Sequence, residues 1–163
     1  MVSEVSEDKI KEWLYEVKDP EIPVISVVDL GVIKEVEIAP EGHITVEMVP
    51  TFAGCPAINF MKMEIEEVLK NHGLENVEVK VNYNRKWSSN DVTELGRKQM
   101  LEYGLSPPPR FEGEVEMEHL EKAICPNCGS TETVMNSTFG PTLCRALHKC
   151  NNCGEAFEQF KPL

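Results

Sequence analysis

Residues 32–49 read V-I-K-E-V-E-I-A-P-E-G-H-I-T-V-E-M-V, two alternating segments on either side of a turn. Apolar and polar side chains alternate over 32–38 and again over 44–49, the pattern of strands that bury one face. Between them, the segment from Ala39 to His43 contains a proline and a glycine, which favour a turn. The stretch therefore predicts a β-hairpin, and the neighbouring segments are expected to pack around it.

A helix is expected on each side of this hairpin. The first begins after Ser6, carries apolar residues at three- and four-residue spacing as far as Val17, and stops at Asp19 because Pro20 follows. The second spans 56–71 and ends at His72-Gly73, glycine being suited to a left-handed C-cap. Alternation over 77–83 then predicts a third strand. Together these elements predict an α-β-β-α-β domain that ends near residue 87.

The remaining segments predict an α+β chain with a separate cysteine-rich module. Asn90 or Asp91 is expected to cap a short helix that ends at Gly104 and faces inward with Leu95, Met100 and Leu101. Three prolines in 106–110 indicate a stiff spacer, and 111–118 an acidic, strand-like linker. The expected division is a domain at 1–104, a linker at 105–118 and a module at 119–163. The strand-like linker could pair with a second copy and give a homodimer.

Charge and hydropathy exclude several classes of function. The chain of 163 residues has a formal net charge of −12, and residues 125–163 carry as many basic as acidic groups, so the excess lies in 1–124. Such a body repels phosphate backbones, and no nucleic-acid partner is expected. The N-terminus lacks the pattern of a signal peptide, and no apolar run approaches the about 20 residues that span a bilayer. A cytoplasmic protein with reduced cysteines and no membrane association is expected.

Two C-x-x-C-G motifs are the strongest spacing signal. Cys125 and Cys128 form the first and Cys150 and Cys153 the second, each followed by a glycine that permits the tight turn. Four thiolates from two such knuckles complete a tetrahedral site, so a structural zinc ion in a zinc ribbon is expected. A rubredoxin-like iron site uses the same ligands and is the alternative. His148 is expected at the surface rather than among the ligands.

Two further cysteines have open roles. Cys144 is either a small buried side chain or a thiolate near Arg145 and His148 that binds a labile metal or exchanges with a partner. Cys55 lies in T-F-A-G-C-P (51–56) at the expected start of the second helix, where the positive helix end favours a thiolate. Its use in function and a buried structural role are about equally supported.

An acidic loop accompanies Cys55. D-P-E-I-P (19–23) and D-L-G (29–31) are held on a restricted path by prolines and a glycine. Asp19, Glu21 and Asp29 could supply hard oxygen ligands, or the aspartates could cap turns.

These motifs together resemble a known family. D-P-E-I-P, D-L-G-V-I and T-F-A-G-C-P on an α-β-β-α-β frame are similar to the SufT-like, MIP18-type iron–sulfur assembly domain, and the segments 96–109 and 125–162 are similar to the PaaD family. PaaD-like proteins accompany the multicomponent phenylacetyl-CoA epoxidase, a di-iron oxygenase with a flavin and iron–sulfur reductase. The resemblance implies an accessory, non-catalytic factor that delivers iron or a cluster in phenylacetate catabolism. It also implies protein partners, namely oxygenase or reductase subunits and assembly machinery.

The resemblance also assigns site residues. It implies that Cys55 handles a transient iron or iron–sulfur species, that the acidic loop of Asp19, Glu21 and Asp29 shapes the same site, and that Cys144 is the extra cysteine of the ribbon. Cys125, Cys128, Cys150 and Cys153 match the ribbon ligands. Neither a pair of E-x-x-H helical motifs nor a G-x-G-x-x-G motif occurs, so the chain is not expected to be the oxygenase or its reductase. A non-catalytic scaffolding subunit and a thiol redox protein using Cys55 and Cys144 are the alternatives.

Overall fold

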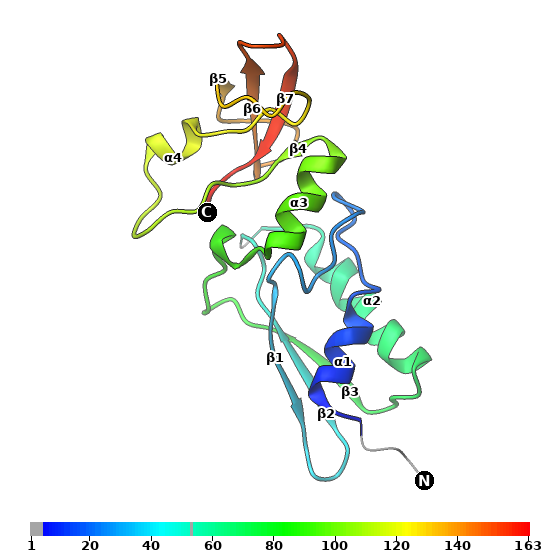
Figure 1. Ribbon diagram of the computed structural model, residues 1–163. Coiled ribbons are helices and arrows are strands. Elements are labelled where there is room, and N and C mark those ends of the chain that lie inside the picture. Colours follow the sequence, from blue (N-terminus) through cyan, green and yellow to red (C-terminus); the bar gives the residue numbers. More distant parts are fainter. Residues whose placement is uncertain (1–4, 53) are drawn as a thin grey trace. The chain divides into compact units, whose positions relative to one another are not determined.

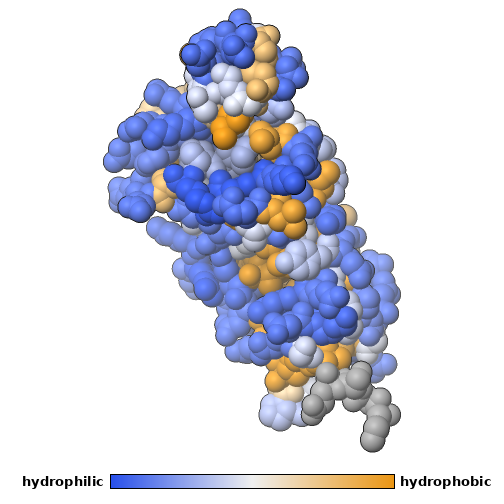
Figure 2. All heavy atoms as spheres, in the orientation of Figure 1, coloured by the Kyte–Doolittle hydropathy of each residue, from blue (hydrophilic) through white to orange (hydrophobic). Residues whose placement is uncertain are grey.

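The computed structural model describes residues 5–52 and 54–163 and contains two compact units, Met1–Trp87 and Ser88–Leu163 (Figure 1). Among the helices in those residues, none is long and apolar enough to cross a membrane. On the face shown in Figure 2, hydrophilic residues predominate and apolar residues form small separate areas. The α+β class expected from the sequence is confirmed.

The first unit is the expected α-β-β-α-β domain. Its elements are α1 (Glu7–Leu14), β1 (Ile33–Ile38), β2 (Ile44–Met48), α2 (Ile58–Asn71) and β3 (Val77–Val81). The strands form one sheet in the order β1-β2-β3. β1 and β2 are the predicted antiparallel hairpin, whereas β3 runs parallel to β2 because α2 carries the chain back across the sheet.

Alternation along the strands determines which face of this sheet is covered. Val36, Val46 and Val79 are almost fully buried, and α1 packs on β1 and α2 on β3, so both helices cover the same face (Figure 1). The intervening residues on the other face are polar: Glu35, Glu37, Thr45, Glu47 and Lys80 line a shallow depression there. The sheet thus has one apolar and one solvated face, as its period of two requires.

Both helices of this unit are shorter than expected. α1 is capped as predicted, with the Lys9 N–H donating to Ser6 Oγ at 3.2 Å, but it ends at Leu14. The chain beyond it turns back on itself: the Val27 N–H donates to Val17 O, and the Asp19 N–H to Ile25 O, both at 3.0 Å. The last turn that the apolar spacing suggested is a tighter one, with the Val17 N–H donating to Leu14 O at 3.1 Å, and the bonds to Ile25 and Val27 then prevent the helix from continuing.

The second unit contains the ribbon. Its elements are the 3-10 turn η1 (Ser89–Asp91), α3 (Glu94–Tyr103), β4 (Leu105–Ser106), α4 (Met117–Glu121), β5 (Thr133–Ser137), β6 (Arg145–Cys150) and β7 (Ala156–Phe160). The four strands form a sheet in the order β4-β7-β6-β5. Strands β5, β6 and β7 are antiparallel neighbours, and β4 joins β7 in parallel.

Helix α3 begins and faces differently from the prediction. Thr93, rather than Asn90 or Asp91, is the cap, because its Oγ1 accepts the Gly96 N–H at 3.0 Å. Met100 is buried as expected, but Leu95 is exposed, since the helix contacts the rest of the unit through its Gly96 and Met100 face. Gly104 ends the helix with φ at 100°, the left-handed conformation predicted for it.

The segment expected to be a linker is packed within the second unit. Arg97 Nη1 donates to the carbonyl of Pro108, and Asn90 Nδ2 donates to the carbonyl of Phe111 at 2.7 Å. The acidic part is not a strand, because α4 begins at Met117. The strand expected in this segment is therefore wrong, whereas the homodimer stays a prediction.

Candidate metal centre

The two cysteine knuckles lie at one end of the ribbon. The first precedes β5, and the second is the turn that joins β6 to β7. In each, the glycine after the second cysteine has a positive φ, 76° at Gly129 and 80° at Gly154. The Gly129 N–H donates to Cys125 O and the Gly154 N–H to Cys150 O. The two turns thus have the same local structure, which the shared C-x-x-C-G spacing predicts.

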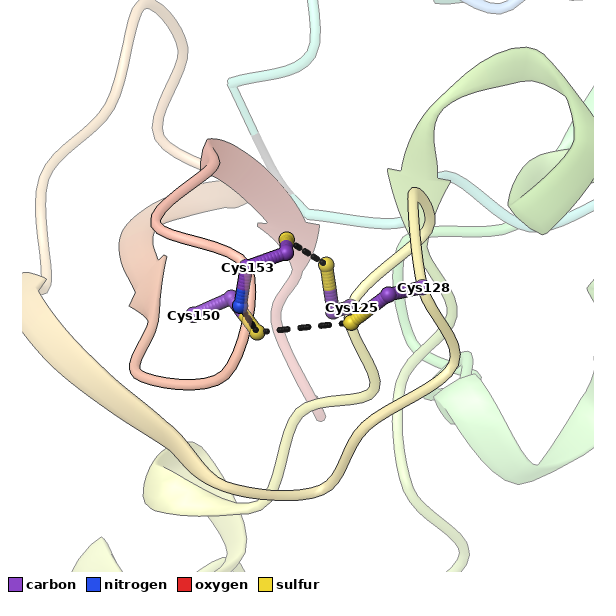
Figure 3. Close-up of side chains that lie close together, drawn as sticks. All are labelled: Cys125, Cys128, Cys150 and Cys153. Atoms are coloured by element: carbon purple, nitrogen blue, oxygen red, sulfur yellow. Dashed lines mark hydrogen bonds between the residues drawn. The ribbon is translucent and has the colours of Figure 1, made fainter.

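The four thiols converge on one point. Their sulfur atoms all lie within 4.8 Å of one another, and Cys125–Cys153 and Cys128–Cys150 are 3.7 and 3.6 Å apart (Figure 3). A tetrahedron with metal–sulfur distances of about 2.3 Å has sulfur–sulfur edges of about 3.8 Å. The quartet therefore fits a tetrahedral thiolate-bound ion such as zinc. Within residues 5–52 and 54–163, no other set of His, Cys, Asp or Glu side chains converges in this way.

Three of the thiols have shifted pKa values. Burial raises the pKa of Cys125 to about 11. A hydrogen bond from the Asn152 amide, followed by one from the Ser130 backbone, lowers the pKa of Cys128 to about 6. The Asn127 amide lowers the pKa of Cys153 in the same manner. A bound cation deprotonates coordinating thiols outright, so the buried Cys125 depends on the cation more than the exposed pair does.

Two asparagines that sequence reasoning missed cross between the knuckles. Asn127 of the first knuckle donates through Nδ2 to Cys153 Sγ at 3.5 Å, and Asn152 of the second donates to Cys128 Sγ at 3.6 Å. Each asparagine occupies the position immediately before the second cysteine of its own motif. This equal spacing in C-P-N-C and C-N-N-C was a signal that the two residues have matching roles.

Cys144 lies apart from the quartet. It directly precedes β6, whereas Cys150 ends that strand, and six residues of extended chain span about 20 Å. Its side chain is buried, with Sγ 3.0 Å from Thr142 Oγ1. It cannot be a ligand of the ribbon ion in this arrangement.

His148 is buried, which corrects the expectation of a surface position. Its Nε2 lies 2.8 Å from Gln159 Oε1, and its ring stacks on Phe157 with centroids 5.5 Å apart. The alternation of β6 turns this residue inward together with Ala146 and Cys150.

Cys55 is half-buried in the loop before α2. Its thiol interacts with the Thr51 side chain and the Ala57 backbone, and Asp19 and Glu21 lie close enough to act on it electrostatically. Its pKa is raised, chiefly by burial and further by these two carboxylates. Burial therefore outweighs the stabilisation of a thiolate that was expected from a helix N-terminus. The helix α2 begins only at Ile58, three residues after Cys55. Ala53 of the T-F-A-G-C-P motif lies outside the described residues.

The aspartates of the acidic loop cap turns. Asp19 Oδ1 accepts the N–H groups of Glu21 and Ile22, at 2.7 and 3.1 Å. Asp29 Oδ2 accepts the Ser26 hydroxyl at 3.2 Å, and Ser26 Oγ accepts the Asp29 N–H. The structure thus brings Asp19 and Glu21 near Cys55, whereas Asp29 is engaged with the turn that begins at Ser26.

Comparison with known families divides the chain in a similar way. Residues 112–161 match the family model described as the PaaD zinc beta ribbon domain. Residues 7–81 match the model described as an iron–sulfur cluster assembly protein. The ribbon match contains all four convergent cysteines, and the assembly-protein match contains Cys55 and the acidic loop.

Individual proteins show the same likeness. The chain is 36% identical to a putative subunit of the 1,2-phenylacetyl-CoA epoxidase of Escherichia coli, over 91% of this chain and 88% of that protein. It is 35% identical to an Fe-S protein maturation auxiliary factor of Porphyromonas gingivalis, over 61% of this chain and 91% of that one. A domain of unknown function (DUF59) from Bacillus anthracis superposes with a TM-score of 0.54 at 25% identity, covering 58% of this chain and 90% of that one.

Proposed function

Because this chain belongs to the PaaD family of 1,2-phenylacetyl-CoA epoxidase components, we propose that it supplies iron or an iron–sulfur cluster to a multicomponent oxygenase. It is an accessory protein of the iron–sulfur assembly class, with a four-cysteine metal centre in its ribbon. The oxygenase or its reductase is the client, and the chain itself performs no oxidation.

The observation that carries this proposal is the half-buried Cys55 thiol beside two carboxylates. A thiol whose pKa is raised by burial and by negative neighbours is protonated at neutral pH and is a poor nucleophile. An incoming iron cation changes this balance, because it displaces the thiol proton while Asp19 and Glu21 compensate its positive charge. A soft sulfur with hard oxygens nearby suits iron.

Cys55, Asp19 and Glu21 do not form a closed set of ligands, which favours a cargo that is bound only transiently. The Asp19 carboxylate already accepts two backbone N–H groups, so it stabilises the cation without being a preformed ligand. Such a site binds weakly and releases its cargo, which a carrier must do. The ribbon ion has a different role: four thiolates enclose it, and the binding energy stabilises the small module.

A scaffolding subunit is the second candidate. Among the described residues, only the four ribbon cysteines form a closed metal site, and such a site stabilises a module without carrying cargo. The surroundings of Cys144 and Cys55 disfavour the third alternative, a thiol redox protein. Cys144 is buried and bonded to Thr142, and the raised pKa of Cys55 leaves little thiolate for exchange.

The test compares client proteins from cells that lack this protein or produce a variant. Oxygenase and reductase are purified from a deletion strain complemented with wild type, Cys55→Ser or Met63→Ala, the last an exposed residue on α2. Iron delivery predicts that Cys55→Ser leaves the clients iron-deficient, as the deletion does, while Met63→Ala restores their iron. Full client iron with Cys55→Ser, but not in the deletion, would establish the scaffolding role instead.

A further inference from the structure

The loop between β5 and β6 presents two large apolar side chains to solvent. In this segment from Thr138 to Cys144, here the Phe139 loop, Phe139 is 68% exposed and Leu143 is 63% exposed. It lies at the end of β6 opposite to the metal-binding knuckles, so metal coordination does not explain it. Exposed apolar side chains that gather on one loop, rather than being scattered singly over a surface, are a feature of interaction sites.

The backbone of the loop is held in one conformation by hydrogen bonds. The Gly140 N–H donates to Arg145 O at 2.9 Å, and the Arg145 N–H donates to Thr142 O at 3.2 Å. Lys161 Nζ donates to Thr138 O at 2.9 Å, and the Lys161 N–H donates to Cys144 O at 2.8 Å. The loop therefore exposes its apolar residues from a fixed frame, which lowers the entropy lost on binding.

Residues that had no assigned role maintain this frame. Ser137 Oγ accepts the Phe139 N–H at 3.1 Å and donates to the Phe139 carbonyl at 3.0 Å. The Thr142–Cys144 contact holds the other side of the loop. Gly140 is required by space, because a Cβ there would lie 3.0 Å from Arg145 O. The motif S-T-F-G-P-T-L-C thus encodes the shape of an exposed loop.

The charge around the loop indicates the chemistry of its partner. No acidic residue occurs from Thr133 to Gly154, and the Glu158 carboxylate of β7 is paired with Arg145, 2.7 Å away. Lys161 Nζ lies over the Phe139 ring, 5.5 Å from its centroid, so a cation accompanies the aromatic side chain. The complementary surface is an apolar pocket bordered by Asp or Glu carboxylates.

A protein fits these features better than a lipid bilayer does. Two side chains are a small apolar area for membrane insertion, whereas two anchors on a rigid loop are sufficient to dominate a protein interface. A bilayer also requires no fixed loop shape.

We propose that the Phe139 loop is the docking surface for the client, with Phe139 and Leu143 entering an apolar, acid-rimmed pocket on an oxygenase or reductase component. This inference rests on the proposed function and specifies how the ribbon engages its partner. Cys55 takes no part in docking.

The test measures the affinity of the full-length, zinc-loaded protein for the purified oxygenase and reductase components of its host. The double variant Phe139→Ser/Leu143→Ser removes both anchors, and we expect its dissociation constant to rise about 30-fold. Gly140→Ala keeps both anchors but displaces the loop backbone and should also weaken binding. Leu95→Ser removes a comparably exposed residue of α3 and should leave affinity unchanged.

The outcomes separate the two proposals. Equal binding by wild type and the double variant would overturn the docking loop and leave the proposed function standing. Wild type that binds neither component would overturn both. Binding of wild type to vesicles of anionic phospholipid, lost in the double variant, would replace the protein partner by a membrane. Loss of binding by Cys55→Ser would contradict the separation of docking from cargo handling.

Discussion

The side-chain amide of Asn152 donates to the sulfur of Cys128 across the ribbon, at 3.6 Å, and so ties the second knuckle to the first. Asn127 makes the reciprocal contact with Cys153 at 3.5 Å. Each asparagine thereby stabilises the thiolate of a solvent-exposed cysteine in the opposite motif. The two contacts together link the knuckles and orient two of the four ligand sulfur atoms.

Removing these amides should weaken metal binding. Asn127→Ala and Asn152→Ala each remove an outer hydrogen bond to a ligand, and we expect each to lower zinc affinity about tenfold. Competition with a chromophoric chelator measures the change. Asn151→Ala is the matched control, because the backbone N–H of Asn151, rather than its side chain, makes the contact with Glu132 O. An equal loss in the control would show that the amide–sulfur contacts have no special role.

The ribbon should unfold without its ion while the first unit persists. Cys125→Ser removes one of the two fully buried ligands, and metal-binding energy in such a module is also folding energy. Hydrogen exchange should show rapid exchange in β5, β6 and β7 and unchanged protection in β1, β2 and β3. Loss of protection in both units together would contradict the modular description.

Alkylation of Cys55 should respond to the acidic loop. The thiolate is the reacting species, and burial together with the Asp19 and Glu21 carboxylates raises the Cys55 pKa. The rate with iodoacetamide should therefore rise with pH and be slower at neutral pH than that of a free thiol. Glu21→Gln removes one raising charge, lowers the pKa and should increase the rate about twofold. Glu35→Gln, on the solvated face of the sheet, should not change it.

The order of elements in the first unit could be predicted because local pattern and burial agree there. Apolar residues alternate along 32–49 and recur every three or four positions on the flanking helices. These are the residues that the structure buries between the sheet and the helices. The end of α1 could not be predicted, since Val17 satisfies the helical spacing but its carbonyl bonds to Val27 instead. Long-range hydrogen bonds of this kind have no signature in local sequence.

The metal quartet was predictable because its ligands lie in two short motifs with a fixed turn geometry. The pKa of Cys55 could not be predicted in this way. Its position before a proline suggested a helix end that would lower the pKa. Burial and two carboxylates that lie 34 or more residues earlier in the chain raise it instead. The inward position of His148 also depended on a strand register that composition does not reveal.

The most direct test of cargo handling is the iron, acid-labile sulfide and zinc content of the anaerobically purified protein, compared between wild type and Cys55→Ser. We predict one zinc ion per chain in both proteins, held by the ribbon, with substoichiometric iron and sulfide in the wild type that disappear in the variant. Zinc alone in both proteins would contradict cargo handling at Cys55 and would leave the protein as a docking subunit.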